Sequence, residues 1–182
     1  HEPEHGVYLA IYLPVDSAQT ISDFNRHAGK EHAVYGTFLT MDDAFPWDWV
    51  TCVTSAYPSA ALHITCEPMN GFAETFEQWA PGGAAYERMD AFAKDCARFG
   101  GPIFLRFAHE ANGNWYVWSP WYSESDTVTT QTYVQGWRNV ADLFHAEAPN
   151  VAMVWGVTQG TGTEQMNDYA AVYPGDAWVD WV

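Results

Sequence analysis

The stretch AAYERMDAFAKDCARFGGPIFLRFAHE, residues 84–110, predicts a helix, a sharp stop and a buried strand. Its first part repeats apolar residues at helical spacing with charged residues opposite, and Gly100-Gly101 then ends the helix. The run IFLRFA over Ile103–Ala108 is apolar except for Arg106, which is typical of a strand buried on both faces. The stretch therefore predicts the repeating unit of a parallel α/β sheet. The apolar helix positions are Met89, Phe92, Ala93, Cys96 and Phe99.

The same alternation of strand and helix extends in both directions along the chain. Six parallel strands with helices between them fit a doubly wound sheet or the first part of an eight-stranded barrel. No GxGxxG follows the first strand and no GxxxxGK[ST] occurs, which disfavours nucleotide-binding folds. Residues 1–182 are expected to form a single α/β domain. The other expected strands are Gly6–Leu13 (closed by Pro14), Ala33–Thr40, Ala61–Cys66, Val151–Val157 and Trp178–Val182, and the other helices are Ile21–Ala28 and Tyr133–Phe144.

Composition excludes several classes of protein. Seven Lys and Arg against 23 Asp and Glu give a net charge of −16, and the basic residues are scattered, so nucleic acid is not an expected partner. No apolar run approaches the ~20 residues that span a bilayer. Cys52, Cys66 and Cys96 have neither CxxC spacing nor a zinc motif, and at most one pair can form a disulfide.

Chemistry is concentrated in RFAHEANGNWYVW, residues 106–118. Strand alternation predicts that Arg106 and Glu110 point inward and that His109 points the other way. An inward glutamate at the carboxyl end of a barrel strand is placed to act as a general acid. The alternative is a salt bridge from Glu110 to Arg106. A zinc-protease HExxH motif is ruled out because position 113 is glycine.

Aromatic residues crowd the segment after Glu110. They lie among Asn, Gly, Ser and Pro, which is typical of a loop, and exposed rings on a barrel rim suit stacking against sugar rings. Asn112 and Asn114 are expected to bond sugar hydroxyls. The alternative is that two or three of the rings cover the barrel top, and at least one is expected to be structural. The aromatic residues are Trp115, Tyr116, Trp118, Trp121 and Tyr122.

The segment HEANGNWYVW (109–118) resembles the HEMNGxWxxW motif of glycoside hydrolase family 26, whose best-known members are endo-β-1,4-mannanases. Three longer blocks are also similar to that family, in the right order. They are RMDAFAKDCARFGGPIFLRFAHE (88–110), YVQGWRNVADLFHAEAPNVAMVW (133–155) and YPGDAWVDWV (173–182). The similarity covers most of residues 61–182 and is weaker elsewhere.

This resemblance implies a (β/α)8 TIM barrel, of which about six strands are present, that cleaves β-linked glycans with retention of configuration. Glu110 matches the family's acid/base, His109 a histidine near the cleavage point, and Trp115 and Trp118 its two aromatic positions. Asn112 and Arg106 are further candidates for substrate contact. Two carboxylates suffice for this chemistry, so no cofactor or metal is expected.

The resemblance also leaves gaps. The family's nucleophile is a glutamate at the end of the seventh strand and is expected beyond residue 182, with the remaining barrel strands in a longer chain. Glu67 and Asp180 are within reach of the barrel but match no nucleophile. The ending WGVTQ (155–159) departs from the family's Trp-Ser-Pro-Asn type, which bears on subsite contacts.

Substrate and location follow from the same reasoning. A neutral polysaccharide such as mannan is the expected partner, because the acidic surface repels polyanions. An extracellular, secreted protein is expected. The rival hypothesis is a non-catalytic carbohydrate-binding or structural domain derived from such a barrel. A copper site formed by His1 and His5, as in oxidative polysaccharide enzymes, is disfavoured because those enzymes are β-sandwiches.

Overall fold

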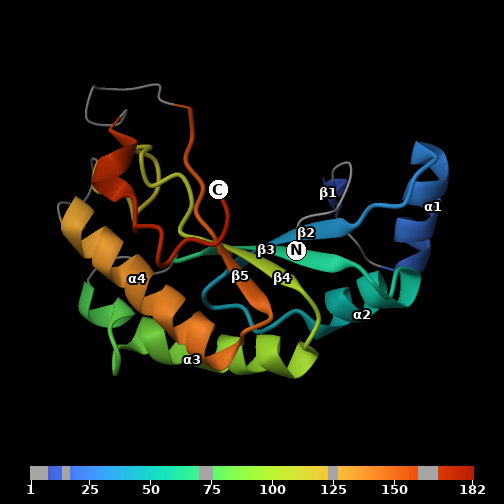
Figure 1. Ribbon diagram of the computed structural model, residues 1–182, viewed down its shortest axis with the longest axis horizontal. Helices are drawn as coiled ribbons and strands as arrows, with labels where there is room; N and C mark the ends of the chain where they lie inside the picture. The colour runs from blue at the N-terminus through green and yellow to red at the C-terminus, as the bar shows by residue number, and fades with distance from the viewer. Residues whose placement is uncertain (1–7, 14–16, 70–75, 123–126, 160–167) are drawn as a thin grey trace.

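The computed structural model describes residues 8–13, 17–69, 76–122, 127–159 and 168–182. In this part of the chain, five parallel strands form one sheet in the order β1-β2-β3-β4-β5 (Figure 1). Each strand pairs with the next one in the sequence, as in a (β/α) barrel, so helices must cross between them. The predicted parallel α/β class is confirmed. The strands are β1 (Ala10–Tyr12), β2 (Val34–Thr40), β3 (Ala61–Glu67), β4 (Ile103–Phe107) and β5 (Val151–Val154).

The helices begin and end at local signals in the sequence. The side chain of Ser17 caps α1, which ends at Gly29 with a φ of 68°. Thr129 and Thr132 form a reciprocal capping box at the start of α4. The helix predicted at residues 84–99 forms over that range and ends at Gly100. The helices are α1 (Ala18–Ala28), α2 (Trp47–Ala56), α3 (Ala84–Phe99) and α4 (Thr130–Glu147).

The two faces of the sheet differ in burial. Leu62, Ile64 and Leu105 are 0% exposed and belong to the core between the sheet and the helices. Figure 1 shows α2, α3 and α4 along this side of the sheet. The alternate residues of β4, Phe104 and Arg106, point away from the helices and are half-buried. The apolar run predicted that β4 is buried on both faces, whereas in the described part of the chain the face turned away from the helices is half-buried.

Several boundaries differ from those expected. The helix α2 was not predicted, and it forms because Val50 and Val53 pack into the core. The expected strand Trp178–Val182 is reduced to a single bridge between Val154 and Trp181. The carboxylate of Asp180 accepts the N–H of Met153 at 2.7 Å. In a longer strand next to β5, a backbone carbonyl would accept this N–H instead.

Other expectations lie partly outside the described residues. His1, His5, Gly6 and Pro14 are among them. Cys96, expected as a small buried apolar residue, is 0% exposed. No described helix is both long enough and apolar enough to cross a membrane.

Candidate active site

The backbone turns sharply where β4 ends. Ala108 and Glu110 adopt left-handed conformations with φ of 45° and 55°, which side-chain-bearing residues rarely do. The N–H of Ala108 bonds to Cys66 on one side, and the N–H of Glu110 bonds to Gly156 at 2.7 Å on the other. Strand alternation therefore fails here, and the prediction that His109 points away from the barrel interior is wrong.

Three side chains hold the carbonyls of this turn. Tyr133 donates its hydroxyl to Ala108 at 2.9 Å, and Trp137 donates its indole N–H to Phe107 at 3.1 Å, both from α4. Trp118 donates to the carbonyl of His109 at 2.9 Å. These buried donors satisfy acceptors that the end of the strand leaves unpaired, which fixes the turn.

Inside the barrel, His109 meets Glu67 at the end of the neighbouring strand. The Nε2 atom of His109 lies 3.2 Å from Oε1 of Glu67. Burial raises the pKa of the Glu67 carboxyl, and the charge of Glu110 adds to that effect, while Arg106 opposes it. Burial also raises the pKa of Tyr116, with contributions from Glu67 and Glu110. The two carboxylates therefore lie within electrostatic range of each other at the carboxyl edge of the sheet.

Arg106 makes its contacts away from Glu110. Its Nε donates to the hydroxyl of Thr65 at 3.1 Å, and its guanidinium lies 5.5 Å from the ring centre of Phe38. Among the described residues, no ion pair joins Arg106 to Glu110. The alternative, a salt bridge from Glu110 to Arg106 inside the barrel, is therefore wrong.

Asn112 connects two loops of the structure. It is 0% exposed, and its side-chain amide donates to the carbonyl of Thr158 and accepts its N–H, both at 2.9 Å. This pair ties the loop after β4 to the segment after β5. The expectation that Asn112 bonds sugar hydroxyls is wrong for this arrangement, because the residue is 0% exposed and its amide binds the backbone of Thr158. Asn114 is exposed.

The two candidate tryptophans occupy different environments. Trp115 is 44% exposed and presents a ring to the rim, as expected of a sugar-binding residue. Trp118 is 0% exposed and stacks on Tyr116 with centroids 4.2 Å apart and planes at 11°. Trp118 therefore offers no free face to a ligand, contrary to the expectation for it. A Cβ at Gly113 would lie 2.5 Å from the Trp115 ring, so a side chain there would require this exposed ring to move.

Acid is expected to destabilise the protein through His109. Burial, helped by the charge of Arg106, lowers the pKa of His109 from 6.5 to about 4. Below pH 6.5 the unfolded chain binds a proton that the folded ring refuses, so stability is present above that pH and falls as pH drops towards 4. The expected loss from this group between pH 7 and pH 5 is about 2 kcal/mol.

Urea unfolding of the wild type and of His109→Gln at both pH values measures this loss. The wild type should lose more stability than the variant. An equal loss in the two proteins would contradict the assignment.

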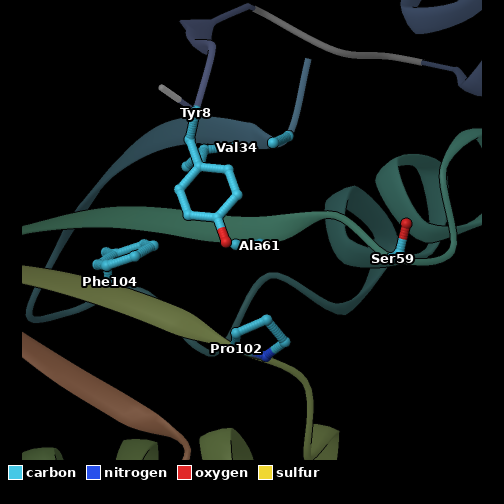
Figure 2. Close-up of a pocket in the computed structure, with 7 residues that line it drawn as sticks. Tyr8, Val34, Ser59, Ala61, Pro102 and Phe104 are labelled. Atoms are coloured by element: carbon cyan, nitrogen blue, oxygen red, sulfur yellow. The ribbon is translucent and has the colours of Figure 1, made fainter. Parts of the chain in front are cut away.

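A separate pocket lies at the other end of the strands, where β2, β3 and β4 begin. Figure 2 shows the ring of Tyr8 over it, with Ser59 and Phe104 among the residues around it. None of the side chains that line it is charged. In the part of the chain that the structure describes, no three His, Cys, Asp or Glu side chains are grouped to hold a metal ion. The pocket beneath Tyr8 therefore offers no charged side chain for acid/base chemistry.

Comparison with known proteins finds a matching family and several relatives. A family model described as glycosyl hydrolase family 26 matches residues 85–182, which include His109 and Glu110. Endoglucanase H of Acetivibrio thermocellus is 31% identical over 169 residues, which are 91% of this chain and 18% of that protein. A mannan endo-1,4-β-mannosidase of Bifidobacterium adolescentis is 33% identical over 84 residues, which are 43% of this chain and 8% of that protein. The chain thus spans less than a fifth of either relative's length.

A solved structure supports the fold. The family 26 domain of an endo-β-mannanase/endo-β-glucanase from Prevotella bryantii aligns with a TM-score of 0.67 at 17% identity. The alignment covers 94% of this chain and 65% of that domain. At this identity the likeness shows the fold alone. The sheet and helices of this chain form part of a (β/α)8 barrel, as predicted.

Proposed function

The chain belongs to glycosyl hydrolase family 26, and from this membership we propose that it is part of a retaining glycoside hydrolase that cleaves β-1,4-linked mannan-type polysaccharide. Glu110 is the general acid/base. The observation that carries the proposal is the position of His109-Glu110, next to Glu67 at the carboxyl edge of a parallel sheet. Enzymes built on this barrel place their chemistry at that edge.

The proposed mechanism needs a second carboxylate. In a retaining glycosidase it lies ~5–5.5 Å from the acid/base, attacks the anomeric carbon and forms a covalent glycosyl-enzyme. Glu110 first protonates the leaving oxygen and then, as a carboxylate, activates the water that releases the sugar. We place the nucleophile beyond residue 182, on a later barrel strand. Trp115, which is 44% exposed, is the described residue proposed to contact the sugar near the cleavage point. The resemblance assigns such a contact to His109 as well, but its ring is 3% exposed and its Nε2 lies against Glu67.

The substrate is proposed to be a neutral polysaccharide outside the cell. A net charge of −16 disfavours polyanionic glycans. Mannan is supported by the mannosidase relative, and a β-glucan is the second candidate because the relative matched over 91% of this chain is an endoglucanase. Subsite loops decide between the two.

Hydrolysis by the full-length protein tests the proposal. Mannan, mixed-linkage β-glucan and xylan are incubated separately, and the anomer released first is identified by proton NMR. Cleavage of mannan with initial release of the β-anomer is the expected result. Preferential cleavage of the glucan would move the proposal to the second candidate. Binding without cleavage of any of them would overturn the hydrolase and favour a carbohydrate-binding domain.

A further inference from the structure

Packing holds the His109 ring on several sides. The residue is 3% exposed, and its ring meets Phe38, Tyr116 and Trp118 edge-on, at centroid distances of 6.2, 5.0 and 5.9 Å. The backbone carbonyl of His109 also accepts the indole N–H of Trp118. The ring therefore cannot turn without displacing its aromatic neighbours.

Glu67 reaches this ring from another strand. It is the last residue of β3, its side chain is 17% exposed, and its Oε1 lies 3.2 Å from Nε2 of His109. An ionised Glu67 carboxylate only accepts hydrogen bonds, so beside it a neutral imidazole carries its proton on Nε2. Nδ1 is then bare. Among the described residues this buried atom has no hydrogen-bond partner, so none of them competes with Glu67 for the proton of the ring.

Because the His109 ring is neutral near pH 7, its tautomer decides which nitrogen donates a hydrogen bond and which accepts one. Burial and Arg106 lower the pKa of His109 to about 4, so the ring is neutral near pH 7. A neutral imidazole has one donor and one acceptor, and the hydrogen bond at one nitrogen decides the role of the other.

The same contact bears on Glu110. His109 lies between Ala108 and Glu110, the two residues with left-handed backbones. A turn of this kind persists only when its surroundings over-determine it. The other contacts that hold it act on backbone atoms, whereas the bond to Glu67 joins the central side chain of the turn to the neighbouring strand.

Building on the proposed function, we infer that Glu67 is a positioning residue: by accepting a hydrogen bond from Nε2 it fixes the tautomer of His109 and holds the turn that carries Glu110. Glu67 acts through His109 and takes no part in bond cleavage. The sequence marked Glu67 only as a carboxylate within reach of the barrel.

Nitrogen NMR of ¹⁵N-histidine-labelled full-length protein at pH 7 tests the tautomer without any substrate. The His109 signal is identified by its loss in His109→Gln. The wild type should show the proton on Nε2, and Glu67→Ala should shift the ring towards the other tautomer or a mixture. A wild-type proton on Nδ1 would overturn the inference, and this result needs no variant at Glu67.

Kinetics test the consequence for the reaction. Glu67→Ala should lower kcat by about 10- to 100-fold, the effect known for removing a carboxylate that orients a metal-binding histidine, with KM changed less than about threefold. Glu67→Gln keeps an acceptor oxygen for Nε2, so it should keep the tautomer and recover part of kcat. The matched control is Glu147→Gln, an exposed position on α4, which should match the wild type.

The outcomes separate this inference from the proposed function. Equal loss of kcat in the Ala and Gln variants, or no loss in either, would overturn the positioning role. If Glu67→Ala does not fold, the Gln variant and the wild-type tautomer still decide. A wild-type protein that cleaves no glycan would overturn the proposed function, and the NMR result would then stand alone as a statement about His109.

Discussion

Glu110→Gln should lower kcat on the polysaccharide substrate by about 10³-fold, since general acid–base catalysis contributes roughly 10²–10⁴-fold. The amide has nearly the shape of the acid but no proton to give to the leaving oxygen. Glu110 is half-buried and makes no ion pair among the described residues, so its substitution removes no structural contact of that kind. The initial rate of reducing-end release by the full-length protein measures the effect.

Two further measurements distinguish a chemical effect of Glu110→Gln from a structural one. Thermal unfolding of Glu110→Gln should stay close to that of the wild type, which shows that the loss is chemical. A substrate with an activated leaving group should recover much of the rate of glycosyl-enzyme formation, because such a group leaves without protonation. Glu147→Gln is the control for removing a negative charge elsewhere. An undiminished rate in Glu110→Gln would remove Glu110 from the mechanism.

Trp118→Ala should lower the free energy of unfolding by about 4 kcal/mol, within the range measured for buried aromatic truncations. The ring is 0% exposed, stacks on Tyr116 and donates its N–H to the carbonyl of His109. Its removal leaves a cavity and an unpaired carbonyl beneath the turn that carries Glu110. Activity should fall with stability, and urea unfolding together with kcat measures both.

Trp115→Ala is the matched comparison, three positions earlier in the same loop. Trp115 is 44% exposed, so stability should change by less than about 0.5 kcal/mol. If its ring stacks on sugar, KM should rise about fivefold, equivalent to about 1 kcal/mol. The reverse pattern, in which Trp118→Ala weakens substrate binding and leaves stability intact, would restore Trp118 to the sugar-binding surface.

Local patterns in the sequence predicted much of the fold. The apolar spacing in residues 84–99 and the glycine after it predicted α3, because helix periodicity and a left-handed C-cap are properties of neighbouring residues. The strands β2 and β3 were expected from short apolar runs and begin and end within one residue of their expected bounds. The helix α2 was missed because its burial depends on residues distant in sequence.

Site residues were harder to predict than the strands that hold them. Trp115 and Trp118 lie in one loop and have the same chemistry, yet Trp115 is exposed and Trp118 is buried next to His109. Asn112 has the polarity of a sugar ligand, but its amide is used by a backbone segment 46 residues away. No property of the residue itself distinguishes these roles.

The sequence by itself determined the parallel α/β architecture, the family and the pair His109-Glu110 at the end of a strand. Only the tertiary structure decided which way His109 points, that Arg106 bonds Thr65 and makes no ion pair with Glu110 among the described residues, and that Glu67 is the partner of His109. Periodicity and motifs are encoded by adjacent residues. The side-chain directions depend on two left-handed backbone positions and on a contact across 42 residues, which the packing of β3, β4 and α4 brings about.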